Sequence, residues 1–177
     1  MQHTLIALVE NKPGVLNRVS SLFRRRNFNI ESLNVGRTEK SDISRMTIVV
    51  DSQSVEASRV EANLYKLVNV IQVADLAESP TVSRDLALIK VSAQPDHRAE
   101  IMQLVDVFRA RIVDVTNDSL IIEITGDGEK INGFVEVMRP FGILEMVRTG
   151  LVAMVRGSQT VADFGSNGSG KNGNGWH

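Results

Sequence analysis

The residues best suited to chemistry lie in one short stretch near the N-terminus. Asn11 and the pair Pro13-Gly14 stand between an aliphatic run, Thr4 to Val9, and an apolar pattern that begins at Val15. Backbone N–H groups at the start of a helix have no partner within the helix, so they favour a carboxylate. Gly14 lets a ligand approach the backbone because it has no Cβ. These features predict a small carboxylate site at the helix start.

Asn29 and three apolar residues extend this candidate site. Asn29 begins the next extended segment and offers both a hydrogen-bond donor and an acceptor. Two asparagines with helix-end amides suit the charged groups of an amino acid, and Val15, Leu16 and Ile30 suit an aliphatic side chain. The same junction has an ordinary structural use, because Asn11 can simply cap the helix. The residues alone leave both interpretations open.

Two other strings resemble known motifs but lack the context that those motifs need. The string from Gly165 to Asn172 is close to a phosphate-binding P-loop, yet Asn172 stands where that loop requires Ser or Thr. The segment 126–128 resembles the opening of a thiamine diphosphate motif, but the nearest following Asn, Asn132, is much too close. Asp127 is instead expected to cap a helix. We therefore assign neither motif.

No set of side chains points to a catalytic or metal centre. The three histidines, His3, His97 and His177, fall in a strand start, a helix start and a tail, which makes a shared site improbable. Glu10 and Glu31 are placed so that they can approach each other at strand ends, but isolated carboxylates are usually solvated surface groups. We expect a protein without a catalytic residue or metal ligand of its own.

Composition indicates a soluble globular protein. The chain has 177 residues, 42% of them hydrophobic, and its 20 basic and 21 acidic residues create no net field that favours nucleic acid. No apolar run approaches the roughly 20 residues that span a bilayer, and no secretory leader is expected from the first residues. The absence of cysteine fits a reducing compartment. We expect a cytoplasmic protein with neither a nucleic-acid nor a membrane partner.

The elements that must position these residues follow one order twice. The best-defined helix begins at Val15 and ends at the run Arg24-Arg25-Arg26, where positive charge suits a helix C-terminus. In the first half we expect strands at 4–10, 28–36, 44–51 and 68–76 and helices at 15–26 and 60–68. In the second half we expect strands at 85–93, 111–115, 119–125 and 143–155 and helices at 101–108 and 131–138.

This repeated order predicts an α+β protein with two ferredoxin-like βαββαβ domains. The expected domains are residues 1–77 and 85–157, joined by a polar linker at 78–84. From residue 158 to 177 the composition is dominated by Gly, Asn and Ser, so we expect a disordered tail.

Longer strings in the chain add a family resemblance. The string HTLIALVENKPGVLNRVSSLFRRRNFNIESLNVG resembles the N-terminal ACT domain of acetolactate synthase regulatory (small) subunits. Further strings are similar to the same family in the same order: SRMTIVV, YKLVNVIQV, VSRDLALIKV, FRARIVDV and RPFGILEMVRTGLVAMVRG. The resemblance extends to Gly157 and excludes the tail.

The resemblance implies a homodimer formed by ACT sheets set edge to edge, with valine or a related amino acid bound between the chains. The matching positions are Asn11, Gly14, Val15 and Leu16 of one chain with Asn29 and Ile30 of its neighbour. It also implies a catalytic large subunit that carries thiamine diphosphate, magnesium and FAD and acts on pyruvate, alone or with 2-oxobutyrate. The small subunit holds no cofactor, stimulates that enzyme of branched-chain amino acid biosynthesis, and confers feedback inhibition.

Two alternative functions follow from the same fold. An ACT-type amino-acid sensor of another pathway, such as a transcriptional regulator, would need a DNA-binding helix-turn-helix or a basic face, and neither is visible. A small ferredoxin-like enzyme would need a convergent acid–base pair, which the residues do not supply. We further expect Gly14→Asp to abolish valine sensitivity while stability barely falls.

Overall fold

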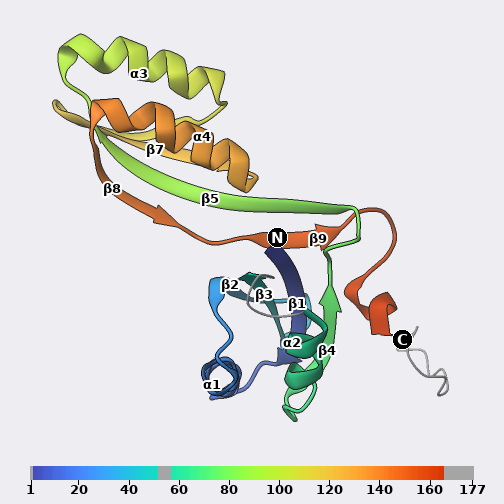
Figure 1. The fold of residues 1–177 in the computed structure, drawn as a ribbon. Helices are drawn as coiled ribbons and strands as arrows, with labels where there is room; N and C mark the ends of the chain where they lie inside the picture. The colour runs from blue at the N-terminus through green and yellow to red at the C-terminus, as the bar shows by residue number, and fades with distance from the viewer. Residues whose placement is uncertain (1, 52–56, 166–177) are drawn as a thin grey trace. The chain divides into compact units, whose positions relative to one another are not determined.

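The computed structural model describes residues 2–51 and 57–165. The chain divides into two compact units, one made of Met1–Val82 with Ala153–His177 and the other of Ser83–Val152. Each unit contains an antiparallel sheet and two α-helices, so the expected α+β fold with two ferredoxin-like units is confirmed (Figure 1). No helix in the described ranges is long and apolar enough to cross a membrane.

The first unit contains a four-stranded sheet in the order β2-β3-β1-β4. Its elements are β1 (Gln2–Glu10), α1 (Val15–Arg26), β2 (Ile30–Arg37), β3 (Ile43–Asp51), α2 (Ala57–Leu64) and β4 (Val70–Asp75). All three strand pairs are antiparallel. Because β1 and β3 occupy the centre, β2 and β4 form the two edges of this sheet.

Helix α1 forms where the apolar spacing predicts it. Val15, Val19, Leu22 and Phe23 are buried on one face and pack against sheet residues in the first hydrophobic core. The helix ends at Asn27, whose left-handed backbone (φ 56°) sends its N–H to carbonyl oxygens of the last turn. This core holds the start of α1 firmly against the sheet.

The second unit repeats this element order. Its elements are β5 (Thr81–Ser92), α3 (Pro95–Val107), β6 (Arg111–Val115), β7 (Ser119–Gly126), α4 (Gly128–Met138), the 3₁₀ turn η1 (Arg139–Phe141) and β8 (Ile143–Arg148). The strand order is β6-β7-β5-β8. Ile89, Ile122 and Phe134 are fully buried in a core of its own. Strand β5 begins at Thr81, so the polar segment expected as a linker at 78–84 is already partly strand.

The C-terminal segment differs from expectation. The single closing strand expected at 143–155 is interrupted after Arg148, and a separate strand β9 (Val152–Val155) follows a left-handed Gly150. The second domain was expected at 85–157; in the structure the compact second unit is Ser83–Val152, and the chain from Ala153 onward groups with the first unit.

Part of the expected disordered tail is also folded. Residues Val161–Gly165 form a 3₁₀ helix, η2, and Val161 is buried with Ile6, Ala74 and Val155. The prediction of disorder from residue 158 is wrong for this segment. Two of its apolar residues, Val161 and Phe164, pack against the sheet, and the overall composition of the tail gave no sign of this contact. The rest of that tail, 166–177, lies outside the described residues.

Candidate functional site

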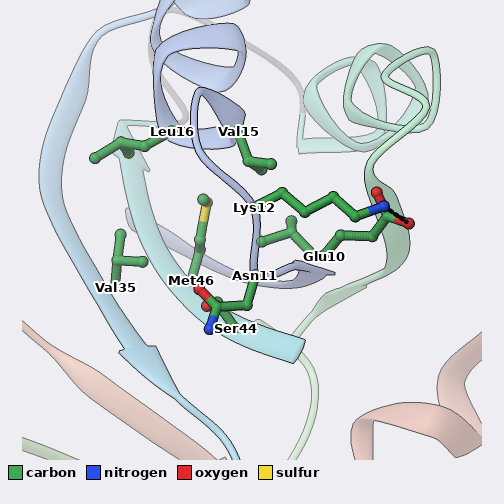
Figure 2. A pocket seen from close by; sticks show the side chains of 9 residues that line it. Glu10, Asn11, Lys12, Val15, Leu16, Val35, Ser44 and Met46 are labelled. Atoms are coloured by element: carbon green, nitrogen blue, oxygen red, sulfur yellow. Dashed lines mark hydrogen bonds and ion pairs between the residues drawn. The ribbon is translucent and has the colours of Figure 1, made fainter. Parts of the chain in front are cut away.

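A small pocket lies between the start of α1 and the β2–β3 pair (Figure 2). Its volume is about 130 Å³. The lining residues are Val9, Glu10, Asn11, Lys12, Val15, Leu16, Val35, Ser44 and Met46. Three of the six residues predicted for the site, Asn11, Val15 and Leu16, therefore line one cavity.

Most of the pocket lining is aliphatic. Val9, Val15 and Met46 are at most 5% exposed, so they belong to the hydrophobic core as well as to the pocket. Leu16 and Val35 remain 45% and 42% exposed. Val35 lies directly opposite Met46 in the β2–β3 pair, which explains why a residue of the edge strand reaches this place. Such a surface suits a small branched aliphatic group.

The start of α1 presents backbone hydrogen-bond donors. Gly14 is the N-cap residue, and among the described residues no side chain caps this end and no acidic residue stands in the first turn. The N–H of Val15 reaches the Lys12 carbonyl only at 3.4 Å. The first-turn N–H groups of Leu16 and Asn17 have no acceptor within the helix, because intrahelical bonding begins later. This end therefore favours an anionic group.

Gly14 itself has a backbone that only glycine adopts easily. Its φ of +84° lies in the left-handed region, where a side chain is strained. A Cβ built on Gly14 would meet no atom within 4 Å, so the space beside this residue is open. Gly14 was predicted from the sequence for close approach of a ligand; the structure adds that the turn itself requires it.

Asn11 does not cap the helix. Its side-chain Nδ2 donates to the Ser41 carbonyl at 2.9 Å, and its backbone N–H donates to the Asp42 carbonyl at 2.7 Å. The capping interpretation is therefore wrong: Asn11 ties the β1–α1 loop to the turn between β2 and β3. Together with Ser44, it supplies side-chain amide and hydroxyl groups to the pocket lining (Figure 2).

Charged groups flank the pocket on the side of β4. Glu10 accepts hydrogen bonds from Asn69 Nδ2 at 2.5 Å and from Lys12 Nζ at 3.1 Å, and Arg18 Nη1 donates to Asn69 Oδ1 at 2.7 Å. The hydrogen bond from Asn69, followed by that from Lys12, holds the pKa of the Glu10 carboxyl below its ordinary value. Glu10 is thus an ionised carboxylate that is hydrogen-bonded to Asn69 and Lys12.

Glu10 and Glu31 do not approach each other. Glu10 lies opposite Ile43 at one end of β3, whereas Ile30, next to Glu31, lies opposite Val50 at the other end. Seven residues of strand separate these positions, or roughly 23 Å. The two carboxylates do not form a pair, because the strand register places them at opposite ends of β3.

Asn29 and Ile30 lie outside the pocket of their own chain. Asn29 is exposed just before β2, and Ile30 is half-buried against the first core. Ile30 pairs with Val50, but the pocket residue Val35 is five residues further along the same strand, roughly 17 Å away. A single chain therefore does not bring these two predicted residues to the other four.

Six lining residues were not predicted from the sequence for this site: Val9, Glu10, Lys12, Val35, Ser44 and Met46. Alternation along β3 could have shown that Ser44 and Met46 share a face. Their meeting with the start of α1 depends on strand order, which no local pattern reveals. The place of Val35 in the pocket could not be predicted for the same reason.

The remaining candidates have structural uses. Asp127 caps α4 by accepting from the Lys130 N–H at 2.8 Å, as expected. His3 Nδ1, on β1, contacts Asp75 at 3.0 Å, and His97 lies on α3 near Glu100. In residues 2–51 and 57–165 no group of three or more His, Cys, Asp or Glu could hold a metal ion. The P-loop-like string beyond Gly165 and His177 lie outside the described residues.

Comparison with known families identifies this architecture. The family model described as "AHAS small subunit-like ACT domain" matches residues 5–72. A second model, "Small subunit of acetolactate synthase", matches residues 84–157. The first unit, a βαββαβ sheet with a glycine-started helix, therefore places the chain in the class of ACT-domain proteins.

Whole-chain relatives specify the family. The chain is 56% identical to a probable acetolactate synthase small subunit of Archaeoglobus fulgidus and 50% identical to the acetolactate synthase small subunit of Mycolicibacterium smegmatis. These alignments cover 90% of this chain and 99% and 94% of the two relatives. The crystal structure of the acetolactate synthase small subunit from Thermotoga maritima matches with a TM-score of 0.80 at 41% identity, over 90% of this chain and 99% of that one. The chain belongs to the family of acetolactate synthase small subunits.

Proposed function

We propose that this protein is the regulatory subunit of acetolactate synthase and that valine, or a related branched-chain amino acid, binds at the start of α1. The observation that carries this proposal is the uncapped, glycine-started end of α1 beside an aliphatic pocket. One end of this site suits a carboxylate, and the other suits a short branched side chain. Family membership supplies the enzyme that such a sensor would control.

Each part of the amino acid has a matching group. The carboxylate accepts from the first-turn N–H groups of α1, and Gly14 leaves it room to approach. The aliphatic side chain packs against Val15, Leu16 and Met46. The ammonium group lies toward Asn11. A ligand this small gains about −8 to −4 kcal/mol, which corresponds to an affinity in the micromolar to millimolar range.

We further propose that two copies pair through the β2 edges of their sheets. Leu16 and Val35 stay substantially exposed in one chain, and a second chain at the β2 edge would cover them. Such pairing would bring Asn29 and Ile30 of one copy toward the pocket of the other. The effector would then touch both chains, so it would stabilise one packing of the dimer over another.

The catalytic partner is the large subunit of acetolactate synthase. In this proposal the large subunit holds thiamine diphosphate, magnesium and FAD and converts pyruvate, alone or with 2-oxobutyrate, to acetohydroxy acids in the cytoplasm. The small subunit stimulates this reaction and makes it sensitive to its end product. A coupling free energy of about 1–3 kcal/mol between effector binding and the active arrangement is enough for feedback inhibition.

Gly14→Asp tests the site in the enzyme reconstituted from both subunits. A carboxylate about 4 Å from that of valine costs roughly 1–4 kcal/mol, depending on the effective dielectric, so the valine concentration for half-inhibition rises about fivefold to a thousandfold. The earlier expectation that stability barely falls needs correction. The φ of +84° strains any side chain at this position, at a cost of about 1–2 kcal/mol.

Gly14→Asn is the matched control, because Asn has nearly the shape of Asp and suffers the same backbone strain but carries no charge. Gly14→Asn should keep more valine sensitivity than Gly14→Asp, and both variants should still stimulate the large subunit. Equal valine inhibition of wild type and Gly14→Asp would refute the proposed site. Equal losses in the two variants would assign the effect to strain instead of charge.

A further inference from the structure

The β4 edge of the first sheet is closed by a side chain. Val73 lies opposite Ala7 in the β1–β4 pair, and β4 has no strand on its other side in the described sheet. The Tyr65 hydroxyl accepts from the Val73 N–H at 3.0 Å and donates to the Val73 carbonyl at 3.1 Å. One hydroxyl thus occupies both backbone groups that Val73 would offer to a further strand.

Helix α2 positions Tyr65 so that its hydroxyl reaches the outer edge of β4. Tyr65 directly follows α2, and its N–H still donates to the Glu61 carbonyl at 3.1 Å, so the helix holds the ring beside β4. Tyr65 is 46% exposed as a residue, so it lies at the rim of the sheet and not within the core. The polar contacts of its side chain are those to Val73.

The chain covers a neighbouring position of β4 as well. Gln72 Nε2 donates to the carbonyl oxygens of Val161 at 2.7 Å and Ala162 at 3.2 Å, which places η2 against this strand. Both contacts lie within the first unit. Tyr65 therefore occupies backbone groups at the outer edge of β4, while η2 packs on the sheet face that carries Ile6 and Ala74.

We propose that Tyr65 is a strand-edge plug that limits the ACT sheet to one neighbour, a second copy of this chain at β2. This inference rests on the proposed pairing at β2. A sheet with two open edges could also add copies from β2 to β4; that contact is heterologous, so it builds a ring or an open filament larger than a dimer. With β4 plugged, only the symmetric β2 pairing remains, and it closes as a dimer.

Tyr65→Phe removes the hydroxyl and keeps the ring. Light scattering coupled to size exclusion should give a wild-type mass that stays at the dimer over a hundredfold concentration range. The mass of Tyr65→Phe should rise with concentration to at least twice that value. Ile71 lies near the start of β4 and is 49% exposed. Adding Ile71→Lys places a charge on this edge strand and should return the variant to the dimer. A Tyr65→Phe mass that matches wild type throughout overturns the proposal, as does a large species that Ile71→Lys fails to reverse.

Hydrogen exchange of the wild-type Val73 amide gives an independent measurement if Tyr65→Phe folds poorly. Strong protection at this outer edge supports the plug, and exchange at the rate of an exposed amide overturns it. Valine inhibition is measured separately at dimer concentrations. Loss of the valine response in wild type would refute the proposed function and leave the mass comparison intact. A monomeric wild type would refute β2 pairing, and growth of Tyr65→Phe would still test the plug.

Discussion

The two units share an order of elements but begin their helices differently. Helix α1 starts at Gly14 and, in the part of the chain that the structure describes, has neither a side-chain cap nor an acidic residue in its first turn. Helix α3 carries Asp96 in its first turn, and α4 has both the Asp127 cap and Glu129. The second unit thus places carboxylates of its own at the starts of its helices, whereas the start of α1 has none among the described residues. In the proposed function, this difference of a few residues at one turn is what gives the first unit its site.

The strongest way to break this comparison is to damage the second core. Phe134 is fully buried, with its ring 5.2 Å from that of Phe108. Phe134→Ala should lower the free energy of unfolding of the second unit by about 3–5 kcal/mol, because it leaves a cavity. Urea unfolding measures this loss, and calorimetry with valine should show affinity within about twofold of wild type. Loss of valine binding while the first unit stays folded would mean that the site depends on both units.

A reciprocal exchange of charge sharpens the same comparison. Asn17→Asp gives the first turn of α1 an acid of its own, and Asp96→Asn removes the acid from α3. Asn17→Asp should raise stability by about 0.3–1 kcal/mol and weaken valine binding about fivefold, through roughly 1 kcal/mol of repulsion. Asp96→Asn should lower stability by a similar amount and leave valine binding unchanged. Thermal melts and calorimetry report both effects.

Opposite signs for stability and binding in Asn17→Asp are the distinguishing result. A variant that gains stability and still binds valine as tightly as wild type would show that the ligand carboxylate does not lie at this helix end. The comparison between the two units would then reduce to a difference in capping alone.

The smallest expected effect concerns pH at the rim of the site. The pKa of Glu10 is lowered from 4.5, chiefly by the hydrogen bond from Asn69. A lowered carboxyl pKa contributes stability above the ordinary value, and this contribution disappears as the pH falls through the folded-state pKa. The melting temperature of Glu10→Gln should therefore lie below that of wild type at pH 7, and the difference should shrink below pH 4.5.

Asn69→Ala provides the control for this measurement. In its background, Glu10→Gln should lower the melting temperature less than in wild type, because the main cause of the pKa shift is already gone. A pH-independent difference between wild type and Glu10→Gln would contradict the assigned cause.

Some features were predictable because they depend on nearby residues. The apolar spacing from Val15 to Phe23 defines α1, and Asp127 before α4 is a typical cap. Other features were not predictable because they join distant segments. The Ser41 carbonyl accepts a hydrogen bond from the Asn11 amide, thirty residues away in the chain. Val161 packs against Ile6, at the other end of the sequence. No pattern within one helix or strand carries that information.

The sequence by itself determined most of the elements, their repeated order and the glycine at the start of α1, since these follow from side-chain periodicity and from one turn. The tertiary structure decided which parts of β2 and β3 reach that turn, which edge of the sheet Tyr65 closes, and why Asn29 cannot join the pocket of its own chain. The physical reason is strand register. It is set by the packing of whole faces against a core, and only that packing places residues of separate strands side by side.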